Sequence, residues 1–227
     1  MKILIINFDN PGHASLNLMI DAFVSGAEGA GAECVRLNVH ELKINPCLGC
    51  TDDLFFSSDG ECRQHDDMIS VYPHMRSSEA WIFAFSLNNE HAMRQLRNLL
   101  DRLEPLMNVP FKTNGNGSKH GKVALLSVTE DWNVKRFTPV VELFKTMSGA
   151  FEKELVGEML RPHCEALVAL RNLHANVQET LDAVREAGAE VVTQERINPE
   201  TLKNIQKELI SEQSFINELL VKTKHIN

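Results

Sequence analysis

Long apolar runs, an excess of basic charge and a regular cysteine framework are all missing from this sequence of 227 residues. No run approaches the roughly 20 apolar residues that a membrane-spanning helix needs. The opening MKILIINFDN has only a short apolar run and no small-residue cleavage site, so we do not expect a signal peptide. With 31 acidic and 23 basic residues the net charge is −8, which gives a nucleic-acid partner or an anionic membrane surface no electrostatic support.

The number and spacing of the cysteines indicate a cytosolic protein with reduced thiols. Five is an odd number for a chain of this size, and the spacing is not that of a disulfide scaffold. Reduced thiols are the rule in the cytosol, where glutathione and thioredoxin keep them so. We therefore expect a cytoplasmic protein that binds neither nucleic acid nor membrane.

Five short apolar segments alternate with helical patterns along the chain. Residues 2–8, 80–85 and 122–129 are almost continuously apolar, which is typical of strands buried on both faces, and residues 33–39 and 155–160 complete the set. Helical spacing covers residues 15–27 (with Ser15 as N-cap), 68–76, 93–107, 140–151, 167–192, 199–210 and 212–224, the last two as a hairpin. The alternation predicts an open, doubly wound α/β sheet.

The domain organisation follows from where the strand patterns stop. After about Glu165 no further apolar strand segment occurs. We expect an α/β domain over residues 1–165 and a helical C-terminal extension over residues 166–227 that packs on the same domain. Ligands of such sheets bind at the carboxyl ends of the strands, beside the point where the strand order reverses. The loops 9–15, 86–91 and 129–134 are therefore the expected ligand loops.

The stretch from Ile44 to Met68, INPCLGCTDDLFFSSDGECRQHDDM, holds three of the five cysteines. Together with QLRNLLDRLEPL at 95–106, GKVALL at 121–126 and a first loop containing Gly12 and Ser15, it resembles the flavodoxin-like NAD(P)H-dependent FMN oxidoreductases, a group that includes the iron–sulfur flavoproteins. The resemblance covers nearly the whole chain. It implies a flavodoxin-like, five-stranded parallel sheet with helices on both faces, FMN as cofactor, NAD(P)H as electron donor and a homodimer.

The resemblance also assigns the FMN site to the three loops. The phosphate would lie at the start of the first helix and the flavin ring against the other two loops. No side chain needs to act as catalyst, since the flavin carries the chemistry, and His91 is the one residue considered for acid–base work. The implied cofactor-binding residues are Asp9, Asn10, Gly12, His13, Ala14, Ser15, Ser86, Leu87, Asn88, Asn89, Thr129, Glu130, Asp131 and Trp132.

All three loops depart from the family pattern. Asp9 stands in place of a hydroxyl residue, Pro11 in place of a basic residue and Ala14 in place of asparagine. The second loop lacks the usual proline and aromatic residue, and the third carries the carboxylates of Glu130 and Asp131. A phosphate prefers free N–H groups and positive charge, and a flavin ring prefers a flat apolar surface, so these changes oppose FMN binding.

The cysteine segment leaves three alternatives open besides a redox dithiol of Cys47 and Cys50, which is the weaker idea because Asp52 and Asp53 place negative charge beside it. Iron–sulfur members of the family carry four cysteines, and here Cys47, Cys50 and Cys62 stand with Asp53 in the remaining position. Cys47, Cys50, Cys62 and His65 also form an acceptable zinc spacing. The third alternative, that the cysteines pack the segment onto the sheet as small apolar residues, is favoured, so neither an iron–sulfur cluster nor zinc is expected.

Two functional hypotheses follow, with a third of lesser weight. The first is an NAD(P)H-dependent, FMN-containing oxidoreductase that passes electrons to a small-molecule or protein acceptor. The second is a flavodoxin-like protein that has lost FMN and serves as a binding or partner subunit, or acts on another ligand in the same cleft. The third is a metal or iron–sulfur protein built on the cysteine segment.

Overall fold

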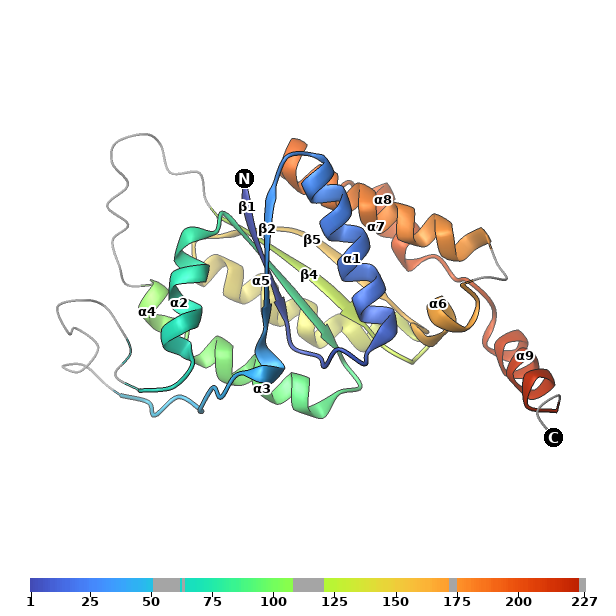
Figure 1. Ribbon diagram of the computed structural model, residues 1–227, viewed down its shortest axis with the longest axis horizontal. Helices are drawn as coiled ribbons and strands as arrows, with labels where there is room; N and C mark the ends of the chain where they lie inside the picture. The colour runs from blue at the N-terminus through green and yellow to red at the C-terminus, as the bar shows by residue number, and fades with distance from the viewer. Residues whose placement is uncertain (51–61, 63, 108–120, 172–174, 225–227) are drawn as a thin grey trace.

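The structure, a computed structural model, describes residues 1–50, 62, 64–107, 121–171 and 175–224 (Figure 1). The strands are β1 (Lys2–Asn7), β2 (Glu33–Asn38), β3 (Ala80–Ser86), β4 (Lys122–Val128) and β5 (Glu154–Arg161). The helices are α1 (Ala14–Gly29), α2 (Met68–Ser77), α3 (Glu90–Asp101), α4 (Glu104–Met107), α5 (Thr138–Ala150), α6 (Glu165–Ala169), α7 (Ala175–Thr193), α8 (Pro199–Gln206) and α9 (Glu212–Lys224), with 3₁₀ turns η1 (Val39–Glu41) and η2 (Val134–Phe137).

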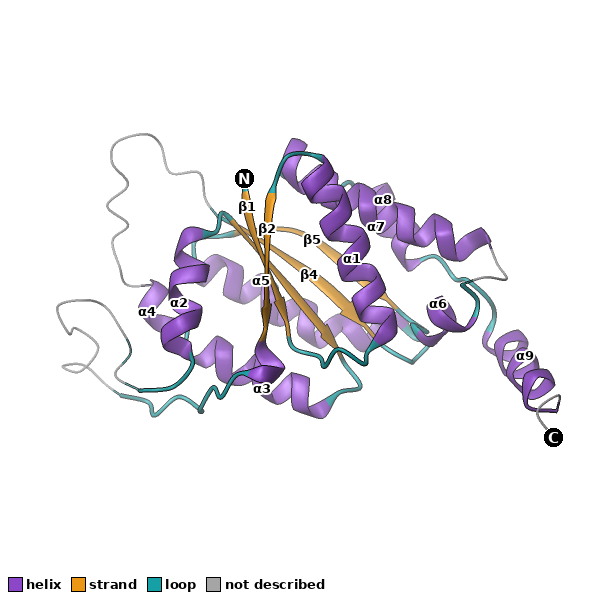
Figure 2. Cartoon of the chain, viewed as in Figure 1, coloured by secondary structure: helices purple, strands orange, loops and turns teal. Residues whose placement is uncertain are grey.

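The strands form one parallel sheet in the order β2-β1-β3-β4-β5 (Figure 2). This confirms the predicted doubly wound α/β architecture. The strand order reverses between β1 and β3, because the chain first adds β2 on one side of β1 and then β3 on the other. None of the helices that the structure describes is long and apolar enough to cross a membrane.

Both faces of the sheet are buried. Alternate residues of β1 point to opposite sides, so Ile3 and Ile5 join one core while Leu4 and Ile6 join the other. Side chains of α1, α6, α7 and α8 complete the first core, and those of α2, α3 and α5 complete the second. This two-sided burial explains why the segments of the central strands β1, β3 and β4 are continuous apolar runs rather than alternating patterns.

The C-terminal helices are part of the first layer. Helix α7 packs along α1, and the two backbones cross at a pair of glycines. A Cβ at Gly26 would collide with the carbonyl group of Arg185, and a Cβ at Gly188 would collide with that of Phe23. The close crossing is therefore possible only because neither position carries a side chain.

Three helix boundaries differ from the sequence-based prediction. Helix α3 ends at Asp101 instead of continuing to Met107, because Pro105 has no N–H for the carbonyl of Asp101 and its ring would clash there. The helix expected over residues 167–192 is two helices, α6 and α7, with residues 172–174 outside the described part. Helix α8 ends at Gln206, because a buried arginine takes its last carbonyl groups, as described below.

The predicted hairpin of the last two helices is wrong. Helix α9 extends away from the body of the molecule and does not fold back along α8 (Figure 1). One of its residues nevertheless reaches the core, since the Phe215 side chain is 4% exposed and contacts the ring of Trp132. The helix is thus attached to the domain through its first turn.

A buried ion pair holds the two ends of the cysteine segment together. Arg102 donates from Nη1 to Asp66 Oδ2 at 2.7 Å and from Nη2 to Asp66 Oδ1 at 3.1 Å, and both side chains are 1% exposed. The same groups hold the chain on either side, because Asp66 accepts from the N–H of Asn45 and Arg102 donates to the carbonyl of Asn45. The DDM and DR motifs therefore form one structural anchor between α2 and α3.

The glycine crossing predicts opposite effects for one substitution at two sites. Gly188→Ala is expected to lower the free energy of unfolding by about 2 kcal/mol or more, since the new methyl group has no space against α1. Gly149→Ala, in α5 with nothing within 4 Å of the added Cβ, is expected to raise it by up to about 1 kcal/mol through helix propensity. Urea denaturation of both variants measures the difference, and equal effects would contradict the crossing.

The ion pair predicts a pH-dependent loss of stability. Burial raises the pKa of Asp66, but the hydrogen bonds from Arg102 and from the N–H groups of Asn45 and Met68 outweigh it, and the pKa is lowered. Asp66→Asn is expected to cost about 3–5 kcal/mol near neutral pH, because it leaves the guanidinium buried without a counter-ion.

The sign of the pH effect follows from that lowered pKa. The carboxylate contributes its stability above the ordinary aspartate pKa of about 3.9 and loses it as the pH falls through the lowered folded value. Denaturation curves should therefore show the gap between wild type and Asp66→Asn closing in acid. Asp101→Asn is the control: its carboxylate is half exposed and 4.0 Å from Arg97, so its removal is expected to cost less than about 1 kcal/mol at any pH.

Candidate functional site

The carboxyl ends of β1, β3, β4 and β5 meet at one edge of the sheet. The loop after β1 leads into α1, the loop after β3 into α3, and the loop after β4 into η2. Backbone hydrogen bonds continue past the strand ends, from Phe8 N to Ala84 O at 3.0 Å and from Leu87 N to Val128 O at 2.9 Å. The three expected ligand loops therefore lie side by side at the edge where such sheets bind ligands.

Asp9 links the first two loops at the point where the strand order reverses. Its side chain is fully buried, and its two carboxylate oxygens accept hydrogen bonds of 2.7 Å from the N–H of Ser86 and from Nδ2 of Asn89. Asn89 in turn accepts the N–H groups of His91 and Ala92 as the N-cap of α3. The carboxylate thus positions the start of α3 and does not face outward as a free anion.

Asn88 links the second loop to the third. Its Oδ1 accepts from Thr129 Oγ1 at 2.9 Å and from the N–H of Glu130 at 3.0 Å. Ser86 Oγ accepts the N–H of Asn88 at 3.2 Å and holds this residue in place. Asp9 and Asn88 together connect all three loops through side chains, so the edge is a cross-linked unit.

The first loop ends in a helix start with free donors. His13, rather than the predicted Ser15, is the N-cap of α1, and its Nδ1 accepts the N–H of Leu16 at 3.4 Å. Asn10 Oδ1 accepts the N–H of Gly12 at 2.8 Å and shapes the turn. Among the described residues, no hydrogen-bond acceptor is recorded for the N–H groups of Ala14 and Ser15. Two backbone donors at the positive end of a 16-residue helix can hold an anion.

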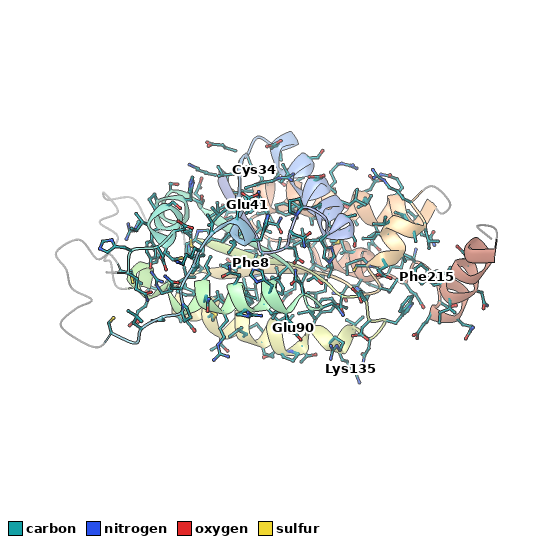
Figure 3. All side chains as sticks on the ribbon, turned by 60° about the horizontal axis from the view of Figure 1, so that its bottom comes forward. Phe8, Cys34, Glu41, Glu90, Lys135 and Phe215 are labelled. Carbon is teal, nitrogen blue, oxygen red and sulfur yellow. The ribbon has the colours of Figure 1, made fainter. Side chains whose placement is uncertain are left out.

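Trp132, one of the implied cofactor-binding residues, has its ring engaged elsewhere. It stacks on His163 with centroids 5.1 Å apart and an interplanar angle of 15°, and Phe215 lies 5.5 Å away on α9 (Figure 3). The indole N–H donates to the carbonyl of Ile210 at 3.2 Å. The third loop is thereby joined to the C-terminal segment.

Arg161, at the end of β5, was not among the predicted site residues. Its guanidinium is fully buried and donates to the carbonyl groups of Pro162, Ile205 and Lys207 at 2.7–2.9 Å. No carboxylate pairs with it within the described part of the chain, and burial lowers its pKa to about 10. A cation at the carboxyl end of α8 satisfies the last carbonyls and the helix dipole, so its role is structural.

His163 lies against this arginine. Its Nε2 is 2.7 Å from Arg161 Nη2 and accepts the N–H of Leu209 at 3.2 Å. Burial first, and the neighbouring guanidinium second, lower the pKa of His163 to about 3. The ring is therefore neutral near pH 7 and is not a proton donor for chemistry at this edge.

Cys164 connects β5 to the start of α1. Burial raises the pKa of its thiol to about 11, and a hydrogen bond from the Ser15 hydroxyl opposes this only in part. A thiol with such a pKa stays protonated near neutral pH, which makes it a poor nucleophile. Ser15 itself is 5% exposed, so its hydroxyl belongs to the interior and its N–H to the helix start.

The outer rim of the edge is polar and acidic. Glu90, His91, Glu130 and Asp131 are exposed, and Figure 3 shows Glu90 and Lys135 on neighbouring elements at this rim. Asp131 pairs with the guanidinium of Arg136 at 2.9 Å. No hydrogen bond or ion pair is recorded for the His91 ring within the described residues, and its backbone N–H serves the cap of α3.

The cysteine segment does not gather a metal site among the described residues. Cys47, Cys50 and Cys62 are half-buried and His65 is exposed, and no group of three or more potential ligands that could hold a metal ion occurs in the part of the chain that the structure describes. Cys62 lies beside the phenol of Tyr72 and near Arg102. Asp53, considered as a cluster ligand, lies outside the described residues.

The arrangement as a whole suits binding rather than side-chain catalysis. It offers two free backbone donors at a helix start and a cross-linked set of loops, while burial raises the pKa of the Cys164 thiol and lowers the pKa of His163. Sequence reasoning placed the loops correctly but missed the links made by Asp9 and Asn88 and the role of Arg161. For Arg161 the sequence did contain a signal, because an arginine ends an apolar strand there and is followed by Pro-His-Cys.

Comparison with known proteins supports the fold. No protein-family model matches the chain. A curated iron–sulfur flavoprotein from Archaeoglobus fulgidus is 30% identical over 93 residues, and the match spans only 41% of this chain and 41% of that protein.

Solved structures match over more of the chain. The azoreductase AzrA superposes with a TM-score of 0.54 at 16% identity, covering 86% of this chain and all of that one. An FMN-dependent NADH-azoreductase from Bacillus anthracis, solved in complex with FMN, superposes with a TM-score of 0.52 at 15% identity, covering 85% of this chain and 99% of the other. The chain is similar to these flavodoxin-like reductases in architecture, and its fold is that of the flavodoxin-like proteins.

Proposed function

We propose that this protein is an FMN-binding oxidoreductase that takes electrons from NAD(P)H and passes them to a small-molecule or protein acceptor. The observation that carries the proposal is the helix start at Ala14 and Ser15, which presents two free N–H groups beside the strand-order reversal. The similarity to an azoreductase solved with FMN adds support, because that fold places its ligand at the same edge.

The residues of this edge fit the phosphate group of FMN in part. The N–H groups of Ala14 and Ser15 would hold it, and Gly12 leaves the approach open, since an added Cβ there would meet only the side chain of Asn10 within 4 Å. Leu87, which is half-buried, and Asn88 would border the flavin ring. When bound, FMN supplies hydride acceptance and electron transfer, and this chain supplies binding and orientation.

A second function is favoured by the charge at the same edge. The loops 9–15, 86–91 and 129–134 contain no lysine or arginine, while Asp9, Glu90, Glu130 and Asp131 carry carboxylates. A phosphate dianion approaching Ala14 therefore meets carboxylates without a cation from the same loops, since Arg136, just beyond the third loop, is already paired with Asp131. On this alternative the scaffold has lost FMN and serves as a binding or partner subunit, or binds another ligand in the same cleft.

A visible absorption spectrum, together with a titration with FMN, decides between the two functions. We expect purified, untagged protein to bind added FMN with quenching of flavin fluorescence, and the flavin band to bleach when NADH or NADPH is added without oxygen. A colourless protein that leaves FMN fluorescence unchanged would overturn the first function and support the second. A brown protein containing iron would instead point to the cysteine segment.

One substitution tests the location of the phosphate. Gly12→Asp places a carboxylate at the approach to Ala14 and is expected to weaken FMN binding at least tenfold. Gly149→Asp is the control, because it adds the same charge in open space on α5. If FMN affinity is the same in both variants, the phosphate lies elsewhere.

Asp9→Asn tests whether the Asp9 carboxylate links the first two loops. Ser86 and Asn89 donate to different oxygens of Asp9, and an amide can accept only one of these hydrogen bonds. We expect the free energy of unfolding to fall by about 1–3 kcal/mol. Asp131→Asn, an exposed carboxylate at the same edge, is expected to change it by less than about 1 kcal/mol. Urea denaturation measures both, and equal losses would contradict the linking role of Asp9.

A further inference from the structure

The side chain of Lys153 lies at the edge of the sheet opposite the three ligand loops. Lys153 comes just before β5 and Gly121 just before β4, so both are at the amino ends of parallel strands. Nζ of Lys153 is placed over Trp81 of β3, 3.9 Å from the centre of its ring. The indole N–H donates to the carbonyl of Met75 at 2.9 Å, and Phe151 contacts the ring edge-on. The amine therefore lies against a fixed aromatic face.

The space that this amine occupies exists because residue 121 is glycine. A Cβ at Gly121 would collide with Nζ of Lys153 and would lie 3.4 Å from its Cε. The nearest backbone atom, the carbonyl oxygen of Glu79, would also be 3.4 Å away, which is an ordinary contact distance. Gly121 and the Trp81 ring thus form a cradle for Nζ. A methyl group at position 121 would displace the amine and leave the backbone in place.

The amine has no counter-ion in the described part of the chain. No hydrogen bond or ion pair is recorded there for Nζ of Lys153. The carboxylate of the next residue, Glu154, pairs with Arg196, and the neighbouring ammonium group of Lys122 pairs with Glu195 at 3.5 Å. Burial lowers the pKa of Lys153 to about 8, while the attraction of the indole face for a cation works against that shift.

From the cradle and the missing counter-ion we propose that Lys153 is a site of chemical acetylation by a small acyl phosphate. The neutral amine attacks the carbonyl carbon of the donor and forms a C–N bond. The C–O bond to phosphorus breaks at carbon, inorganic phosphate leaves with the electron pair, and the amine proton passes to water. A lysine withdrawn from water is a competent nucleophile, because a larger share of it is neutral. The product is an uncharged amide, which removes a charge from a poorly hydrated place.

The size of the donor follows from the setting of the amine. Lys153 is only partly exposed, so a two-carbon acyl phosphate reaches it more easily than an acyl group on a large carrier. The inference is independent of the proposed function. Lys153 and Gly121 lie at the amino ends of the strands, whereas the ligand loops follow their carboxyl ends.

Mass spectrometry of the full-length protein treated with acetyl phosphate at pH 7.5 tests the inference. We expect Lys153 to be acetylated about tenfold faster than Lys145, which is exposed and whose pKa is raised by its hydrogen bond to Glu142. Gly121→Ala is expected to lower the rate at Lys153 at least fivefold, because the methyl group displaces Nζ from the cradle into water. Gly149→Ala, with nothing within 4 Å of the added Cβ, is the matched control and is expected to leave the rate unchanged.

Each outcome decides the inference. Faster acetylation of Lys153 than of Lys145, lost in Gly121→Ala and kept in Gly149→Ala, supports the site. Acetylation of Lys145 as fast as that of Lys153 in the wild-type protein would overturn it and show that exposure alone sets the rate, and this comparison needs no variant. A Gly121→Ala protein with an unaltered urea denaturation curve and an unaltered rate at Lys153 would overturn it as well.

Discussion

A parallel sheet of this kind has to be covered on both faces, and that burial is the constraint on which the rest of the molecule depends. Each central strand sends alternate side chains into two separate cores, so helices are required above and below. Crossovers of this type bring every strand to the same edge at its carboxyl end, and the loops that follow the strands are therefore neighbours. The candidate site is a consequence of the way the sheet is buried.

The sequence alone was sufficient to predict the layers of strands and helices, but it was not sufficient to predict where several helices end. Almost continuous apolar runs such as Ile3–Ile6 identified the three central strands, because these strands are buried on both faces, whereas β2 and β5 carry less regular apolar patterns. Helix limits depended on partners far away in sequence. Arg161 ends α8 by taking the carbonyls of Ile205 and Lys207, and no local pattern around residue 206 indicates this. The attachment of α9 likewise involves a residue far away in sequence, since Phe215 contacts the ring of Trp132.

The same distinction holds at the candidate site. Which loops meet could be predicted from the alternation of strands and helices alone. What their side chains do could not, because Asp9 and Asn88 are polar residues in loops, and their hydrogen bonds span 77 to 80 and 41 to 42 positions of the chain. Asp9 replaces a hydroxyl residue of the family that this chain resembles. The Asp9 side chain is buried and accepts hydrogen bonds from Ser86 and Asn89, so its charge is stabilised inside the loops and does not project into the space for a phosphate.

The glycine pair at the crossing of α1 and α7 limits how the length of this chain can vary during evolution. Inserting one residue in either helix between the crossing and the rest of its contacts rotates the remainder by about 100° and brings a side chain against the opposite backbone. Insertions and deletions are thus restricted to the connections on either side of α7. In distant homologues of the same architecture, Gly26 and Gly188 are the positions from which an alignment of the two helices should start.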